Sequence, residues 1–332
     1  MLAAFVRFPA KACQRSLRTI ASQAATKGRL YFQSDQVPRS ILSTGRVGTN
    51  RDLLGSDGEF FGTDPIALEV DISNGRGKQL NLDENGFCLL PHEWAHVDYY
   101  DNQQVIGKYY AECEDIVQRA TGASRALAFD HNIRAKQRKK AGESLRGGSA
   151  VQEPLVTYGV HNDYTVTSAA QRIRQMAKPP SKNDTRKADG SSLLDEDEVE
   201  TLLQKRWLFV NVWRNIAETP VESFPLAACD ARSLDVDDLI VFEIRYADRT
   251  GENYFARYSS HQRWFYFPRM EKDEVMLLKC WDSRGKDFVP KDAQESPVPA
   301  TFSLHGSFEE VASPPDAKDR ESIEVRLVAF FD

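Results

Sequence analysis

The sequence predicts an α+β protein whose C-terminal half is dominated by a jelly-roll-like sheet structure. The main observation is a series of short β-branched and aromatic runs after Arg206, each bounded by Asp, Gly, Pro or Asn, which is the pattern of an antiparallel sandwich or barrel. These runs are RWLFVNVWR, DLIVFEIRY, NYFARYSS, RWFYFP, EVMLLKCWDS and ESIEVRLVAFF. The upstream half mixes strand and helix patterns, and 332 residues with 41% hydrophobic content suffice to bury a sizeable core.

In the upstream half, PIALEVDISNG, GFCLLP and SRALAFDHNIR are apolar or alternating runs that predict three strands. NQQVIGKYYAECEDIVQRATG has apolar residues at helical spacing and ends on Gly122, which predicts an amphipathic helix with a glycine stop. Two further helices are expected. One starts at Ser168, which forms a capping-box pattern with Gln171, and ends before Pro179. The other is LLDEDEVETLLQKR, with acids first and bases last, as suits the helix dipole.

Three polar or basic segments are expected to lie outside this framework. Residues 135–150 and 178–192 have the Pro, Gly, Ser and charge content of exposed insertions. Residues 1–34 contain basic but no acidic residues, which is the composition of an amphipathic mitochondrial transit peptide; a frayed basic tail is the alternative. We therefore expect a leader over 1–34 and a single domain over 35–332, in a mitochondrial or otherwise cytoplasmic protein.

Charge and composition exclude several classes of partner. A formal net charge of −6, without a dense Lys/Arg run in the region that looks folded, argues against nucleic-acid binding, so a small neutral or organic-acid substrate is expected. No stretch approaches the roughly 18 consecutive apolar residues of a membrane-spanning helix. The five cysteines are scattered without a C-x-x-C pair, which argues against a thiolate zinc site and indicates a reducing compartment.

A candidate metal site begins in YGVHND, where His161 and Asp163 are two residues apart. The preceding LVTYGV is a strand candidate, and residues two apart on a strand point to the same face. His305, before the final strand, supplies a third candidate ligand. Two histidines and one carboxylate form the facial triad of non-haem Fe(II) oxygenases, which leaves metal positions open for cosubstrate and dioxygen.

Other residues compete for a role in such a site. PHEWAHVD places His92, Glu93 and His96 in the H-E-x-x-H order of zinc peptidases, but no clear third ligand follows, so a surface or packing role is favoured. His261 is a rival ligand, with a hydrogen-bonded sheet histidine as the alternative. Three residues are consistent either with a pocket wall or with core packing: Trp213, Arg214 and Trp264.

The segment RESIEVR, fifteen residues after His305, predicts a binding site for an organic anion. Arg320 and Ser322 share one face of the expected final strand, and a guanidinium beside a hydroxyl suits the remote carboxylate of 2-oxoglutarate. Arg326 falls on the same face. We favour Arg320, because Glu324 is a ready ion-pair partner for Arg326 and because Arg326, about 20 Å further along the strand, is expected far from the mouth of the site.

Taken together, these stretches resemble the AsaB-type hydroxylase/desaturase family, whose relatives include gibberellin desaturases and the cephamycin methoxylation protein. The resemblance runs from about residue 41 to the end of the chain. It is carried by GFCLLPHEWAHVDYYD, TGASRALAFDHNIR, VHNDYTVTSAAQRI, NVWRNIAETPVESFPLAACDARS, the segment from DLIVFEIRY to LLKCWDS, and RESIEVRLVAF.

The resemblance implies an Fe(II)- and 2-oxoglutarate-dependent dioxygenase on a double-stranded β-helix that hydroxylates or desaturates a secondary-metabolite-like small molecule. It implies His161, Asp163 and His305 as metal ligands and Arg320 as cosubstrate anchor. The chain departs from the family pattern around the distal histidine, where Leu304 and Gly306 replace the usual proline and threonine. The alternative function is a non-catalytic jelly-roll partner of a multi-component modifying system.

Overall fold

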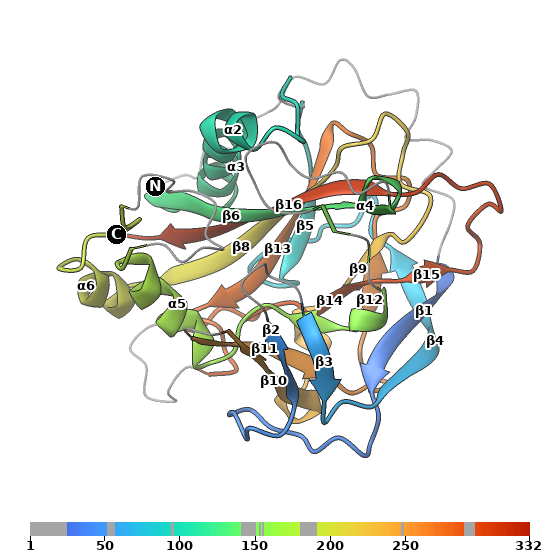
Figure 1. Ribbon diagram of the computed structural model, residues 1–332, viewed down its shortest axis with the longest axis horizontal. Helices are drawn as coiled ribbons and strands as arrows, with labels where there is room; N and C mark the ends of the chain where they lie inside the picture. Colours follow the sequence, from blue (N-terminus) through green and yellow to red (C-terminus); the bar gives the residue numbers. More distant parts are fainter. Residues whose placement is uncertain are drawn as a thin grey trace.

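Two β-sheets carry most of the chain in the computed structural model (Figure 1). The structure describes residues 25–51, 57–93, 96–140, 151–152, 154, 156–179, 191–246, 249–288 and 296–332. Within these ranges the protein is rich in sheet and has few helices, and no helix is long and apolar enough to cross a membrane.

The large sheet has eleven strands, most of them in antiparallel pairs. Their order across the sheet is β15 (Glu309–Glu310), β1 (Ala25–Gln33), β4 (Pro65–Asn74), β12 (Trp264–Tyr266), β9 (Leu226–Cys229), β14 (His305–Ser307), β7 (His161–Asn162), β11 (Thr250–Ala256), β10 (Leu239–Arg245), β2 (Gly48–Arg51) and β3 (Asp57–Phe61). Strands β14 and β7, which carry two of the predicted ligands, lie next to each other near the middle of this sheet.

The small sheet has five antiparallel strands, in the order β5 (Phe87–Pro91), β13 (Glu274–Asp282), β8 (Trp207–Asn215), β16 (Glu321–Phe330) and β6 (Arg125–Ala135). Every residue of β8 is buried, because one face of this sheet packs toward the large sheet and the other packs under a helix. Burial on both faces explains why RWLFVNVWR reads as an almost continuous apolar run instead of an alternating one.

A helical run covers the outer face of the small sheet (Figure 1). It consists of α2 (Asn102–Gln104), the π-helical turn η1 (Val105–Tyr109) and α3 (Tyr110–Thr121). It ends at Gly122, which adopts φ = 75°, the left-handed conformation of a glycine C-cap. The predicted helix and its glycine stop are therefore confirmed.

The remaining helical segments are short. They are α4 (Lys136–Lys140), α5 (Ser168–Met176), α6 (Val199–Gln204) and the 3₁₀ turns η2 (Val156–Tyr158), η3 (Ala231–Ser233) and η4 (Val236–Asp238). The capping box predicted at Ser168 is wrong: the N-cap of α5 is Thr167, which makes no side-chain capping bond. The Ser168 hydroxyl instead donates to the backbone oxygen of Glu252, so it ties the helix to strand β11.

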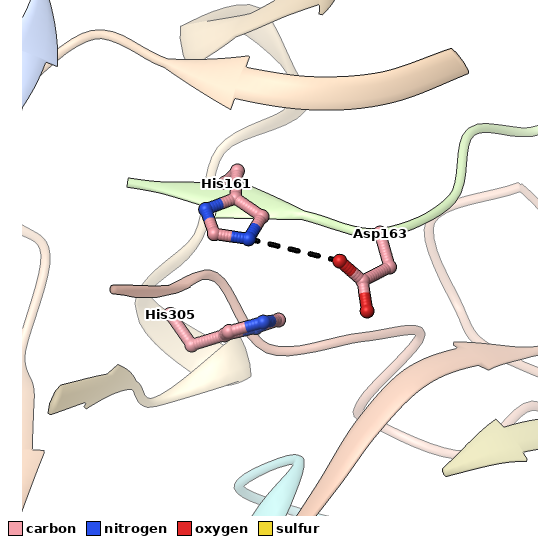
Figure 2. A group of neighbouring side chains, drawn as sticks. All are labelled: His161, Asp163 and His305. Atoms are coloured by element: carbon pink, nitrogen blue, oxygen red, sulfur yellow. Dashed lines mark ion pairs between the residues drawn. The ribbon is translucent and has the colours of Figure 1, made fainter. Parts of the chain in front are cut away.

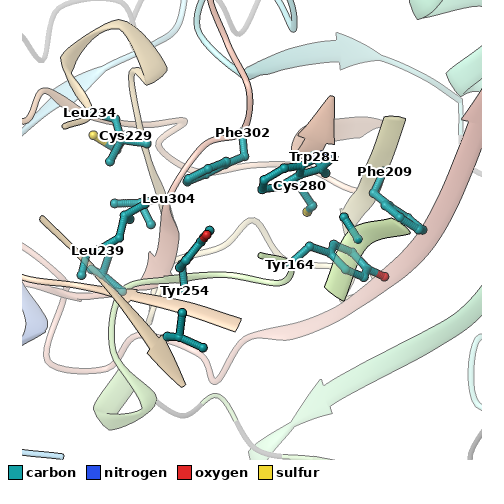
Figure 3. Packing of buried hydrophobic residues seen from close by; sticks show 14 of the residues in the cluster. Tyr164, Phe209, Cys229, Leu234, Leu239, Tyr254, Cys280, Trp281, Phe302 and Leu304 are labelled. Carbon is teal, nitrogen blue, oxygen red and sulfur yellow. The ribbon is translucent and has the colours of Figure 1, made fainter. Parts of the chain in front are cut away.

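The space between the two sheets is filled by a large apolar core (Figure 3). Aromatic rings from segments far apart in the sequence stack in it, such as Tyr164 on Phe209 at 4.1 Å and Trp281 on Phe302 at 5.8 Å between ring centroids. Such offset pairs add directional contacts to the burial of apolar area. The core holds the two sheets at a fixed separation, on which the site described below depends.

The expected leader is wrong at its C-terminal end. Residues 25–33 form β1, which pairs with β4 and β15 and buries Leu30 and Phe32, 0% and 1% exposed. Lys27 and Arg29 contribute to the basic composition, but they pair with Asp71 at 2.8 Å and Glu309 at 3.0 Å on neighbouring strands. They are the outward positions of an amphipathic strand, while residues 1–24 lie outside the described residues.

The two predicted insertions are described only in part. Residue Ala135 ends β6 and the next five residues form α4, while residues 141–150 lie outside the described ranges. Of the second insertion, residues 180–190 are likewise outside them.

Candidate metal centre

His161 is placed by a glycine turn. Gly159 adopts φ = 89°, and its carbonyl accepts a hydrogen bond from Nδ1 of His161 at 2.9 Å. Because a carbonyl only accepts hydrogen bonds, Nδ1 carries the proton, and the lone pair of Nε2 is left to coordinate a metal. The expected strand over LVTYGV is wrong: residues 156–158 form η2, and only His161 and Asn162 form strand β7.

His305 is held in the same way on the neighbouring strand. Its Nδ1 contacts the backbone oxygen of Ser303 at 3.1 Å, and its side chain is buried. His305 lies directly opposite His161 in the pairing of β14 with β7, with 4.8 Å between the ring centroids. Cross-strand neighbours on one face approach closely, so pairing alone brings the two imidazoles together.

Asp163 completes the group just after β7. One ligand atom from each of His161, Asp163 and His305 lies within 4.8 Å of the others, and all three side chains point into the same space (Figure 2). Oδ1 of Asp163 is 3.6 Å from Nε2 of His161. The other oxygen, Oδ2, accepts hydrogen bonds from Nδ2 of Asn211 at 2.8 Å and from Nε of Arg326 at 3.3 Å.

The charge states of these groups suit metal binding. Burial, together with the neighbouring His305, lowers the pKa of His161 to about 4. Burial alone would raise the pKa of Asp163, but the charges of Arg326, His305 and His161 outweigh it and hold this pKa below its usual range. At neutral pH His161 is neutral and Asp163 is ionised, which are the forms that coordinate a metal.

The donor set fits Fe(II). Two imidazole nitrogens and one carboxylate oxygen on one side of an ion match the two-histidine, one-carboxylate arrangement of non-haem iron sites. The carbonyl partners of the two Nδ1 atoms are the outer contacts that fix ring orientation in metal sites. Among the described residues, no other group of three or more His, Cys, Asp or Glu side chains lies close enough together to hold a metal ion.

A polar cavity adjoins the three residues and contains the predicted anion anchor. Its lining is Asn132, Arg134, Tyr158, Gly159, His161, Asp163, Trp213, Leu226, His305, Gly306, Ser307, Arg320, Ser322, Glu324 and Arg326. Residues from β6, β8 and β16 form the wall of the small sheet, and residues from η2, β7, β9 and β14 form the opposite wall. The cavity therefore lies between the two sheets.

Arg320 is a buried charge of this cavity that no carboxylate of the described residues pairs with. It is buried, donates to Oγ of Ser307 at 3.0 Å and to the backbone oxygen of Phe224, and faces the ring of Trp213 at 5.6 Å. Its Nε has no hydrogen-bond partner, and no carboxylate of the described chain pairs with it. Burial first, and then the charge of Arg134, lower the pKa of Arg320.

Arg326 is paired with carboxylates, as expected, but the prediction that it lies far from the mouth of the site is wrong. It contacts Asp163, pairs with Asp130 at 3.1 Å and lies 3.6 Å from Glu324, the ion-pair partner expected from the sequence. It lies beside Asp163, one of the three candidate ligands, whereas Arg320 contacts Ser307, Phe224 and Trp213. Arg320 and Arg326 both line the cavity, and of these two it is Arg320 that lacks an anion among the described residues.

The rival ligands lie elsewhere. His92 contacts Glu112 at 3.2 Å and Arg214 at 2.9 Å, and neither His92 nor Glu93 is in a helix. His261 bonds to the hydroxyl of Ser259 at the surface. Of the aromatic and basic residues considered for the pocket, Trp213 lines it, whereas Arg214 bonds to Tyr109 on the opposite face of the small sheet and Trp264 packs in the core.

Sequence reasoning missed Asn211 and Ser307. Asn211 is the single polar residue inside the apolar run WLFVNVW, and a buried polar residue in such a run is a signal of a site. Ser307 lies two residues after His305 and faces the same cavity, as alternation on a strand predicts once β14 is recognised.

Comparison with known proteins agrees with this geometry. The family model described as "Oxidoreductase/YMDC permease-like domain" matches residues 55–330. The chain is 27% identical over 325 residues to the Fe(II)/2-oxoglutarate-dependent dioxygenase nvfI of Aspergillus novofumigatus, covering 96% of each chain. It is 32% identical over 198 residues to the hydroxylase/desaturase asaB of Aspergillus flavus, covering 54% of this chain and 77% of that protein.

Among solved structures, one titled "iron and alpha-ketoglutarate-dependent endoperoxidase NvfI with different conformation" matches with a TM-score of 0.70 at 22% identity. The match covers 93% of this chain and 99% of that one. The two proteins share a fold.

Proposed function

The chain belongs to the oxidoreductase/YMDC permease-like domain family, and from this membership we infer that it is an Fe(II)- and 2-oxoglutarate-dependent dioxygenase of the AsaB hydroxylase/desaturase type. Its reaction is the hydroxylation or desaturation of a small, secondary-metabolite-like molecule with dioxygen as co-reactant. The names of its relatives favour this enzyme over a non-catalytic partner protein. We assign its two facing sheets to a double-stranded β-helix.

The observation that carries the proposal is the convergence of His161, Asp163 and His305 beside a buried cation without an anion. A metal site alone would also suit a hydrolase. The additional guanidinium of Arg320, which lines the same cavity, suits a dicarboxylate that reaches from the metal to the anchor.

Each residue has a distinct role in this proposal. His161, Asp163 and His305 hold Fe(II), which supplies, with 2-oxoglutarate and dioxygen, the oxidation that removes a substrate hydrogen. Arg320 binds the remote carboxylate of 2-oxoglutarate, assisted by the hydroxyls of Ser307 and Ser322. Trp213 and Leu226 give the cavity apolar wall area that excludes water from the cosubstrate.

The test is anaerobic binding of Fe(II) followed by 2-oxoglutarate, detected by the visible charge-transfer absorption that requires both. We expect His161→Ala, Asp163→Ala and His305→Ala to lose it, with metal affinity falling by more than the roughly 10–100-fold that loss of an outer contact costs. His261→Ala is the matched control, because this histidine bonds at the surface. Wild-type absorption in the three variants, or its loss in His261→Ala, would refute the assignment.

A further inference from the structure

The two oxygens of the Asp163 carboxylate lie in different surroundings. Three groups address Oδ2: Nδ2 of Asn211 at 2.8 Å, Nε of Arg326 at 3.3 Å and the thiol of Cys280 at 4.0 Å. Oδ1 lies 3.6 Å from Nε2 of His161, which is another of the three candidate ligands. One oxygen is thus occupied by donors, and the other faces the space shared with the two histidines (Figure 2).

The two strongest donors are built into adjacent strands. Asn211 on β8 and Arg326 on β16 lie directly opposite each other in the strand pairing, so their side chains leave the same face of the small sheet. Arg326 is fixed further by Asp130 at 3.1 Å, and Asn211 is 1% exposed in the centre of the sheet. A donor pair held this firmly can determine how the carboxylate points.

We propose that Asn211 and Arg326 form a carboxylate clamp that occupies Oδ2 of Asp163 and so restricts Asp163 to a single metal-binding oxygen. This inference rests on the proposed function, since it assumes that Asp163 is a ligand. Asn211 and Arg326 are positioning residues: they act on the metal through Asp163. The clamp also explains why Arg326 lines the cavity without being the cosubstrate anchor.

The number of oxygens that Asp163 offers decides how many positions remain on the ion. With one atom each from His161, Asp163 and His305, an ion with six positions keeps three for cosubstrate and dioxygen. A carboxylate that bound through both oxygens would take one of these three. The clamp therefore keeps open the position on which oxidation depends, in addition to orienting the ligand.

The experiment measures Co(II) affinity of the full chain without cosubstrate, because Co(II) is an air-stable substitute for Fe(II) and binding needs no turnover. The clamp variants are Asn211→Leu, which removes the donor at similar volume, and Arg326→Lys, which keeps the charge and loses the guanidinium fork. Arg206→Lys is the matched control, since Arg206 makes a two-donor contact with a buried carboxylate, that of Asp282, outside the cavity. Circular dichroism and thermal unfolding verify that each variant is folded.

We expect each clamp variant to bind Co(II) about 10–100-fold more weakly and the control to bind within about threefold of wild type. Asn211→Leu should add no further loss to Asp163→Ala, because no carboxylate is left to orient. A further loss in that double variant, or wild-type affinity in the clamp variants, overturns the clamp. Wild-type affinity in Asp163→Ala itself refutes the proposed metal site instead, so the two failures are distinct. Either clamp variant alone suffices if the other does not fold.

Discussion

Arg320 carries a positive charge that the described chain does not pair with a carboxylate. Burying a charge without a partner is costly, so a stable protein keeps one where a ligand supplies the opposite charge. We expect Arg320→Lys, at saturating metal, to raise the 2-oxoglutarate concentration for half-maximal binding about 10–100-fold, the equivalent of the roughly 1.5–3 kcal/mol of a charged hydrogen bond.

Arg326→Lys provides the comparison for this prediction at the same metal saturation. Its guanidinium is already engaged by Asp163 and Asp130, so the half-maximal 2-oxoglutarate concentration should stay within about threefold of wild type. The metal is kept saturating because the clamp predicts weaker metal binding for this variant. A large rise for Arg326→Lys with a near-wild-type value for Arg320→Lys would reverse the two roles.

Single residues of the site differ in how far the sequence reveals them. His161, Asp163 and His305 were predicted from residue type, alternation and chain order, and the structure brings them together. The role of Arg326 was not predictable, since it depends on a pairing with Asn211 across 115 residues of chain. The argument from distance along the strand failed because it assumed, without knowing the neighbouring strands, at which end of β16 the ligands lie.

At the scale of elements, the turn before β7 sets the position of His161. Gly159 has φ = 89°, and a Cβ there would meet the backbone oxygen of Tyr31 at 3.0 Å. We expect Gly159→Ala to cost about 1–2 kcal/mol for the backbone conformation and about 1–3 kcal/mol for the contact. Co(II) affinity should fall too, because the Gly159 carbonyl holds the imidazole. Denaturant unfolding and metal titration measure the two effects.

Gly77→Ala is the control for the stability effect of Gly159→Ala. Gly77 has φ = 74°, but a Cβ there would meet nothing within 4 Å, so this variant carries the conformational cost alone. The difference between the two free energies of unfolding isolates the contact with Tyr31. Equal losses of unfolding free energy in the two variants would show that the contact with Tyr31 adds no cost. Unchanged metal affinity in Gly159→Ala would show that the turn does not position His161.

The length of an element decides whether the sequence predicts it. The strands β8, β10, β13 and β16 were predicted because each has seven to ten consecutive residues that are mostly buried and rich in β-branched, aromatic or other apolar side chains. Strands β7 and β14 have two and three residues, too few for a pattern, and exist because their neighbours β9 and β11 supply hydrogen-bond partners. The elements that carry the two histidines were therefore the least predictable.

At the scale of the whole molecule, the site is a contact between the two sheets. The large sheet carries the proposed metal ligands His161, Asp163 and His305, while the small sheet supplies Asn211 on β8 and the arginines on or beside β16. Neither sheet contains a complete site. The aromatic core between them therefore has a functional role in addition to stability, because it fixes how closely the clamp approaches the ligands (Figure 3).

The last prediction concerns where the folded protein begins. We propose that residues 1–24, which contain four basic residues and no acid, are a mitochondrial leader that ends before β1. A chain lacking residues 1–24 should then unfold at the same temperature and bind Co(II) as the full chain does. A chain lacking residues 1–34 should fail to fold or lose several kcal/mol, because burial of Leu30 and Phe32 contributes about 1.5–3 kcal/mol each and total stability is only about 5–15 kcal/mol. It would also leave β4 unpaired on one side.

Residues 1–24 fused to a fluorescent reporter should direct it to mitochondria. A cytosolic reporter would refute the leader, and equal stability of the two truncations would refute the boundary at β1.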